Sequence, residues 1–149
     1  MPTMHKALSI ANPYPAYILD PVEEMPVGIV RKRVENRTWE ILYRGPLLIH
    51  ASKSRDWLKT VRPEHLPATM AFGFIVGVVD VVACLHVSQF CRSLPPQWSW
   101  VPQHQHASGP FCIILENPRK FISPIPYKGA QGLFNVPDSV VAEQMRKVA

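Results

Sequence analysis

"AFGFIVGVVDVVACLHV", residues 71–87, is the longest apolar run of this 149-residue chain. Its many valine and isoleucine side chains favour a β-strand over a helix, because branched side chains pack well on a pleated surface. Gly73 and Gly77 predict sharp bending of this strand, as at the corners of a small barrel. No run reaches the roughly 18 apolar residues of a membrane-spanning helix, so we expect no membrane partner.

Shorter elements flank this strand on both sides. We expect strands at residues 5–11, 34–37, 47–52, 110–118 and 132–137, short helices at 13–19, 54–60 and 63–70, and a last helix capped by Asp138. Residues 20–30 and 88–109 are rich in proline or polar side chains and are expected to form loops. Short strands with small helices between them predict an α+β fold, a small curved sheet or β-barrel, in a single domain over residues 1–149.

The composition is that of a globular protein with a basic surface. Hydrophobic residues make up 47% of the chain and charged residues 18%, which excludes a disordered chain. The 16 prolines, with only 7 glycines, predict stiff, irregular connections and few long helices. The net charge of +5 favours a polyanionic partner such as nucleic acid or a phosphate-bearing ligand; a basic protein without such a partner is the alternative.

The N-terminus and the cysteines indicate a cytoplasmic protein. The first residues, MPTMHKALSIANPYP, lack the apolar core of a signal peptide. Cys84, Cys91 and Cys112 are odd in number and scattered, which favours reduced thiols. Together with the histidines between residues 84 and 106 they fit no common zinc template, so no metal and no cofactor is predicted.

The charged stretch "RKRVENR", residues 31–37, is the first candidate for a functional site. In an extended segment Glu35 and Arg37 point to the same side and can pair. Lys32 starts on the opposite side, so a twist or bulge before Val34 has to bring it round. One interpretation is a surface ion pair worth about 0–1 kcal/mol. The other is a polar pocket arranged in advance for a ligand.

The segments "VENRTW" and "YRGPLLIHASK" resemble the ASCH domain family, and "KALSIANPYPAYIL" resembles its N-terminal strand and helix. Lys32, Glu35 and Arg37 keep the last part of the family pattern Gly-x-Lys-x-x-Glu-x-Arg. Gly28 lies four residues before Lys32 instead of two, an offset that an insertion around residues 20–27 explains. The segments "IVGVVDVVAC", "GPFCIILENPRKF" and "PYKGAQGLFNVP" resemble later parts of bacterial and phage members, so the resemblance covers nearly the whole chain.

This resemblance implies a PUA-like β-barrel with a cleft lined by the Lys/Glu/Arg motif. The superfamily is associated with RNA binding and with recognition of modified bases. Some small members hydrolyse the amide of acylated cytidines, and others have been linked to ribonuclease activity. In the amide-hydrolysing branch a threonine nucleophile stands where this chain has Glu35, so the same step is not expected here. A carboxylate at that position can orient or deprotonate water instead.

Three charged residues have roles in both a binding protein and an enzyme. Arg37 can form two hydrogen bonds to a phosphate, or bind a carbonyl. Lys32, if desolvated beside arginines, would have a lowered pKa and could act as a base; a solvated Lys32 is the alternative. Lys32, Glu35 and Arg37 are therefore the catalytic candidates if the protein is an enzyme.

Aromatic and basic residues complete the expected ligand site. Tyr14 and Trp39 could stack on a base, although Trp39 could equally be packed in the core. Trp98 and Trp100 either hold their loop in place or form a second stacking platform. Lys128, next to a glycine, suits close approach of a ligand to the backbone, or an ordinary turn. The candidate ligand-binding residues are Asn12, Tyr14, Lys32, Glu35, Arg37, Trp39, Lys53 and Lys128.

Three classes of function remain open at this point. The first, which we favour, is binding of RNA or of a modified nucleoside or nucleotide. The second is hydrolysis of a nucleobase amide or of RNA, which differs from the first in turnover. The third is a protein-binding adaptor, which predicts no ligand in the charged cleft. The sequence does not predict an oligomeric state.

Overall fold

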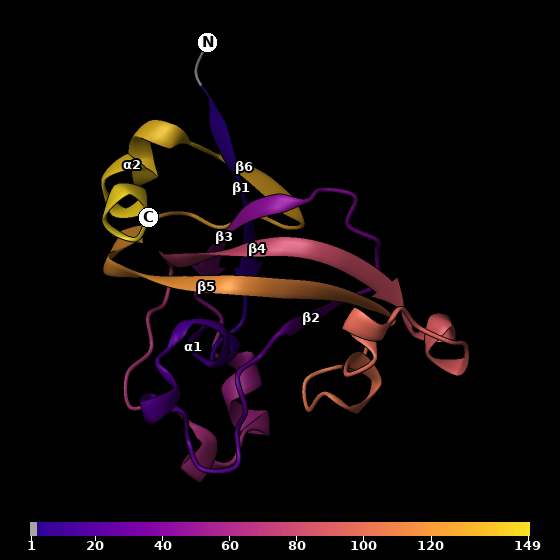
Figure 1. Cartoon of the computed structure of the whole chain (residues 1–149). Helices are drawn as coiled ribbons and strands as arrows, with labels where there is room; N and C mark the ends of the chain where they lie inside the picture. The colour runs from indigo at the N-terminus through magenta and orange to yellow at the C-terminus, as the bar shows by residue number, and fades with distance from the viewer. Residues whose placement is uncertain (1–2) are drawn as a thin grey trace.

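The computed structural model describes residues 3–149, and its centre is one mixed β-sheet (Figure 1). The strands are β1 (Met4–Ile10), β2 (Val34–Arg37), β3 (Gly45–Ala51), β4 (Phe74–His86), β5 (Phe111–Pro126) and β6 (Leu133–Pro137). They lie in the order β2–β5–β4–β3–β1–β6, with β1 and β3 parallel and the other neighbours antiparallel. The predicted α+β class is confirmed. Among residues 3–149 the sheet stays open, with β2 and β6 as its edges and no barrel closure.

The helices are short, as the many prolines predict. Two are α-helices, α1 (Tyr14–Leu19) and α2 (Asp138–Lys147), and the others are short 3₁₀ helices: η1 (Val22–Glu24), η2 (Asp56–Thr60), η3 (Pro63–His65), η4 (Val87–Cys91), η5 (Pro96–Trp98) and η6 (Val101–Gln103). The prediction of a helix over residues 63–70 is wrong after His65, where η3 ends. Leu66 precedes Pro67 and is extended, with φ −78° and ψ 136°, because the proline ring disfavours a helical residue before it.

The predicted capping role of Asp138 is also wrong. Asp138 is the first residue of α2, Pro137 stands at the N-cap, and no side chain caps the helix. The Asp138 carboxylate instead lies 2.6 Å from His5 Nδ1 and accepts a hydrogen bond from Thr3. These two contacts join α2 to the start of β1. As an acidic residue in the first turn, Asp138 also stabilises the helix through the helix dipole.

The strand β4 is the long central strand that the apolar run predicts, and it is irregular at Gly77. Its pairing with β5 shifts register between Ile75 and Gly77, and its pairing with β3 shifts between Ile49 and His50. Such irregularities bend strands in general, and these two lie at one of the glycines where the sequence predicts bending. A Cβ atom on Gly77 would lie 2.5 Å from the Arg119 carbonyl oxygen, so no larger residue fits without displacing β5.

The strand β5 is longer than the expected 110–118. Asn117 takes a positive φ of 50°, which asparagine tolerates better than most residues, and the strand continues beyond it. Asp80 of β4 holds this irregular point: its carboxylate accepts hydrogen bonds from Asn117 Nδ2 at 3.1 Å and Arg119 Nη2 at 2.7 Å. The pairing of β4 with β5 shifts register here, between Val78 and Asp80, so this point is an irregularity within the strand and not its end.

Residues 88–109 form a compact lobe at one end of β4 and β5, built on η4, η5 and η6 (Figure 1). Val101 is fully buried, and Trp98 and Trp100 pack against the same small core. The guanidinium of Arg33 lies 3.8 Å from the ring centroid of Trp100. These contacts favour the interpretation that both tryptophans hold their loop in place.

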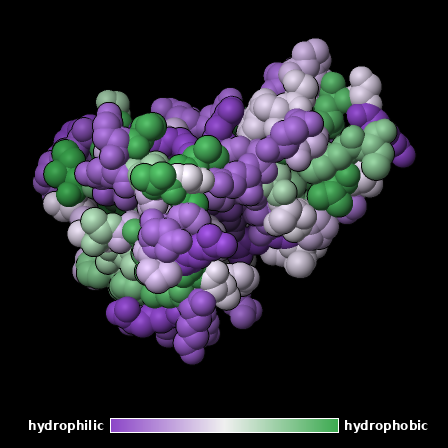
Figure 2. Space-filling view, turned by 90° about the horizontal axis from the view of Figure 1, so that it is seen from below, coloured by the Kyte–Doolittle hydropathy of each residue, from purple (hydrophilic) through white to green (hydrophobic). Residues whose placement is uncertain are grey.

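The main core fills both faces of the sheet. Successive residues of β3 alternate between the faces: Leu47 and Ile49 pack with Ile18 of α1, whereas Leu48 packs with Val141 of α2. The two α-helices thus cover opposite faces. Figure 2 shows a surface on which hydrophilic residues predominate and hydrophobic ones form separate groups. Within residues 3–149 no helix is long and apolar enough to cross a membrane.

Candidate functional site

A large open cleft of about 1670 Å³ lies where the parallel strands β1 and β3 end. Because parallel strands end at the same edge of a sheet, the residues at these two ends share one site. The walls come from β1, β2, the start of α1, and the segments 52–57, 72–74, 105–108 and 126–132. The expected ligand-binding residues that line the cleft are Tyr14, Lys32, Glu35, Arg37, Trp39, Lys53 and Lys128.

Asn12 is the one expected residue that does not line the cleft. It is buried, and its Nδ2 donates hydrogen bonds to the carbonyl oxygens of Ala71, at 2.7 Å, and Ser52, at 3.3 Å. The amide therefore ties the end of β3 to the segment before β4. This is a structural role, because the donor atom is already used within the protein.

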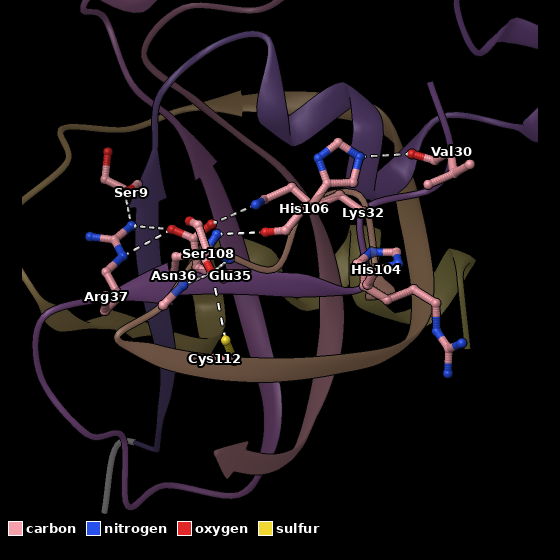
Figure 3. A network of polar contacts seen from close by, with 12 residues as sticks. Ser9, Val30, Lys32, Glu35, Asn36, Arg37, His104, His106, Ser108 and Cys112 are labelled. Carbon is pink, nitrogen blue, oxygen red and sulfur yellow. Dashed lines mark hydrogen bonds and ion pairs between the residues drawn. The ribbon is translucent and has the colours of Figure 1, made fainter. Parts of the chain in front are cut away.

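Glu35 lies between two cations on the floor of the cleft (Figure 3). Its Oε2 accepts from Arg37 Nε at 2.9 Å and lies 2.8 Å from Arg37 Nη2, as expected for neighbours on one side of β2. Its Oε1 lies 3.4 Å from Lys32 Nζ. Lys32 comes before the first residue of β2, and its backbone N–H donates a hydrogen bond to the Tyr17 carbonyl of α1. The Lys32 side chain therefore reaches Glu35 from outside the strand, without a bulge in β2.

The cluster is more deeply buried than a surface ion pair. Lys32 is 5% exposed and Glu35 is 7% exposed, so the alternative of a solvated lysine does not hold. Burial lowers the pKa of Lys32, the Arg37 charge lowers it further, and Glu35 opposes both effects. Burial and, secondly, the Glu35 charge raise the pKa of Tyr14, whose ring centroid is 5.3 Å from Lys32 Nζ. Tyr14 therefore stays a neutral phenol beside a charged cluster.

Aromatic side chains form one wall of the cleft. The Tyr14 and Trp57 rings meet edge to face with centroids 6.4 Å apart, and Trp57 is 53% exposed. Trp39 both lines the cleft and packs against the core, so the two interpretations of this residue are compatible. Phe72 also lines the cleft, and the Arg55 guanidinium lies 3.9 Å from its ring centroid. Flat apolar surfaces of this kind suit stacking of a base.

Gln105, His106 and Ser108 line another side of the cleft, and the sequence did not predict them there. Asn36 Nδ2 donates to the His106 carbonyl at 2.7 Å, and Asn36 Oδ1 accepts from the backbone N–H groups of Ser108 and Gly109 (Figure 3). His106 Nε2 lies 3.0 Å from the Val30 carbonyl. These bonds fix the segment that carries Lys32.

His104 adds a bond of a different kind to the same segment. Its Nε2 accepts a hydrogen bond from the backbone N–H of Arg33 at 3.1 Å. Burial, and then the nearby charges of His106, Arg33 and Lys32, lower its pKa from 6.5 to about 4. Among residues 3–149 no group of three or more histidine, cysteine or acidic side chains is arranged to hold a metal ion.

Ser9 and His50 are a further pair of cleft residues that the sequence did not reveal. Ser9 Oγ lies 3.0 Å from His50 Nδ1, and His50 Nε2 lies 2.6 Å from the Tyr127 carbonyl oxygen. Burial is the main cause that lowers the pKa of His50. A Cβ on Gly129 would lie 2.7 Å from His50 Cε1, so the glycine beside Lys128 serves close packing on this histidine. A polar residue inside the apolar segment "LLIHA" was the available signal.

The fold and the cleft define an α+β domain with an open polar site at the ends of two parallel strands, and comparison with known proteins finds distant relatives. The chain is similar to activating signal cointegrator 1 from Homo sapiens, a protein that contains an ASCH domain, with 27% identity over 128 residues. The Mus musculus protein of the same name shows the same identity over the same length. The match covers 78% of this chain but 21% of each relative, so the chain spans about a fifth of their length. No family model matches the chain.

Proposed function

We propose that this protein binds RNA or a modified nucleoside in the cleft. The observation that carries the proposal is the combination, in one open site, of the buried Lys32–Glu35–Arg37 cluster with the exposed ring of Trp57 and the rim of Lys53 and Lys128. A nucleotide offers matching groups: a flat base, a polar edge and a phosphate.

Each part of the site has a proposed role. Arg37 uses Nε and Nη2 within the protein, on Glu35 and on the Ser9 carbonyl, whereas its Nη1 has no partner among residues 3–149. Nη1 is therefore the donor proposed to meet a carbonyl or phosphate of the ligand. Tyr14, Trp39 and Trp57 supply stacking surfaces for the base. Lys53 and Lys128 neutralise phosphate charge.

The geometry favours binding over hydrolysis. A general base has to reach the reacting proton, and both oxygens of Glu35 already face cations of the protein. Lys32, whose pKa is lowered by burial, is the group that keeps hydrolysis as a second candidate function. Mass spectrometry of modified nucleosides after incubation distinguishes the two: a binder returns every nucleoside intact, and an enzyme converts one.

The name of the relatives favours the adaptor class. A cointegrator is by its name a protein that works with other proteins, but the aligned part is 21% of each relative. An adaptor leaves the cleft without a small ligand. The experiment below therefore also tests this class.

The decisive variant is Arg37→Ala. Thermal shift with a panel of modified nucleosides and short single-stranded RNA identifies a ligand, and titration then gives its affinity. Loss of one charged hydrogen bond is expected to weaken binding by about 1.5–3 kcal/mol. Arg119→Ala is the matched control, because Arg119 pairs with Asp80 outside the cleft at 2.7 Å. Equal affinity of Arg37→Ala and the parent protein for every ligand that binds would contradict the proposal.

A further inference from the structure

Ser9 and His50 form a side-chain pair that the proposed role of the charged cluster does not use. They are register partners on the parallel strands β1 and β3, so their side chains leave the sheet on the same face. Both line the cleft. His50 is 2% exposed, and its ring packs edge to face with Phe134 at a centroid distance of 6.0 Å.

The hydrogen-bond partners of His50 fix the position of its proton. A carbonyl oxygen only accepts, so the 2.6 Å contact between His50 Nε2 and the Tyr127 oxygen requires a proton on Nε2. A neutral imidazole then has a bare lone pair on Nδ1. Ser9 Oγ lies 3.0 Å from this atom and must donate its proton to it. A flip of the ring would place carbon atoms at both contacts, so the two hydrogen bonds, together with the packing of Gly129 and Phe134, hold the ring in this orientation.

The hydroxyl of Ser9 has one proton and two lone pairs. With the proton held by His50, only lone pairs are left for any other group. We infer that Ser9 is a hydrogen-bond acceptor toward the cleft, and that it selects ligands that present an N–H donor at this point. This inference rests on the proposed function and adds a rule of specificity to it.

The neighbouring donor narrows the class of ligand further. Arg37 Nη2 donates to the carbonyl oxygen of Ser9 at 3.0 Å, which brings the guanidinium next to the Ser9 residue. The floor thus presents donors from Arg37 beside an acceptor from Ser9. The complementary group is the polar edge of a nucleobase on which an N–H stands beside a carbonyl oxygen or a ring nitrogen. Cytosine and adenine amino groups meet this condition, and their dimethylated forms do not.

The first test concerns the proton alone and needs no ligand. Nitrogen-15 NMR of histidine-labelled protein at pH 7 is expected to show His50 as the neutral tautomer with the proton on Nε2. The assignment comes from the signal lost in His50→Gln. A proton on Nδ1, or a charged ring at pH 7, would overturn the inference.

The second test concerns selection. Binding of cytidine and adenosine is compared with binding of N4,N4-dimethylcytidine and N6,N6-dimethyladenosine. The parent protein is expected to prefer the amino forms, and Ser9→Ala to lose about 3–10-fold in affinity for them, the range for one neutral hydrogen bond, with little change for the dimethylated forms. Ser9→Thr, which keeps the hydroxyl, should retain the preference. Ser123→Ala is the control, since Ser123 is exposed on β5 and lies outside the cleft lining.

The outcomes separate the two proposals. Equal binding of amino and dimethylated nucleosides by parent and Ser9→Ala overturns the inference and leaves the proposed function in place. Absence of binding for every nucleoside and RNA overturns both proposals. The NMR result then still decides whether the Ser9 hydroxyl donates its proton to His50. If Ser9→Ala does not fold, the comparison of Ser9→Thr with the parent, together with the NMR result, decides the question.

Discussion

Arg37 holds Glu35 through two nitrogens that reach the same oxygen: Nε and Nη2 lie 2.9 and 2.8 Å from Glu35 Oε2. The remaining oxygen faces Lys32. One buried anion therefore compensates two cations, and one of these, Lys32, is almost completely removed from water. The stability of this part of the fold depends on the carboxylate.

The variant Glu35→Gln tests this dependence. It leaves Lys32 buried without an anion, and breaking a buried pair in this way is expected to cost about 3–5 kcal/mol in free energy of unfolding. Urea denaturation at pH 7 measures the loss. The double variant Lys32→Met, Glu35→Gln removes the stranded charge and should recover much of it. A loss below about 1 kcal/mol, the range for an exposed pair, would show that water reaches the cluster.

Acid is expected to loosen the attachment of residues 104–109. His104 has a pKa of about 4 in the folded protein and 6.5 as its ordinary value, so the unfolded chain binds more protons between these values. Stability is therefore fully present above pH 6.5 and falls as the pH drops toward 4. Protonation also converts Nε2 from an acceptor into a donor, which breaks its bond with the backbone N–H of Arg33.

Urea denaturation between pH 7.5 and 4.5 checks this expectation. The difference in unfolding free energy between the parent protein and His104→Gln should shrink as the pH falls. The variant His106→Gln is expected to show a smaller effect of the same sign, because burial also lowers the pKa of His106 but its Nε2 can keep the bond to the Val30 carbonyl when the ring is protonated. Parallel pH curves for parent and His104→Gln would contradict the expectation.

Affinity for single-stranded RNA is expected to fall as salt rises. Phosphates neutralised by Lys53 and Lys128 release counterions, and a site of this size makes few phosphate contacts, so the slope of log K against log salt should be roughly −2 to −4. Fluorescence anisotropy between low and physiological salt gives the slope. The double variant Lys53→Gln, Lys128→Gln should make it shallower by about 1–2. An affinity that does not change with salt concentration would exclude these lysines as the phosphate-binding surface.

Part of the site was predictable from the sequence because it depends on local spacing. Glu35 and Arg37 are two apart in a strand, and this alone places them side by side. The burial of Lys32 was not predictable, because it depends on α1 and on residues 104–109, which are distant in the chain. His50 was missed because its apolar neighbours indicated only a core strand.

The fold shows the same division between local and distant causes. The apolar run around Gly77 predicted β4 and its irregularity, since both follow from side-chain type. The length of β5 was missed, because Asn117 is kept in the strand by its bond to Asp80 of the neighbouring strand. The helix expected at 63–70 failed for a local reason that was overlooked, the effect of Pro67 on Leu66.

The position of β1 between β3 and β6 has a consequence for how the chain folds. Leu8 pairs with Ile49 on one side and with Leu133 on the other. The second pairing joins residues more than a hundred positions apart, and closing so long a loop costs conformational entropy before any contact repays it. Sheets built on such distant pairings fold in milliseconds to seconds rather than microseconds. During synthesis one edge of β1 stays open until residues 133–137 leave the ribosome, so β6 is expected to be the last strand to join the sheet.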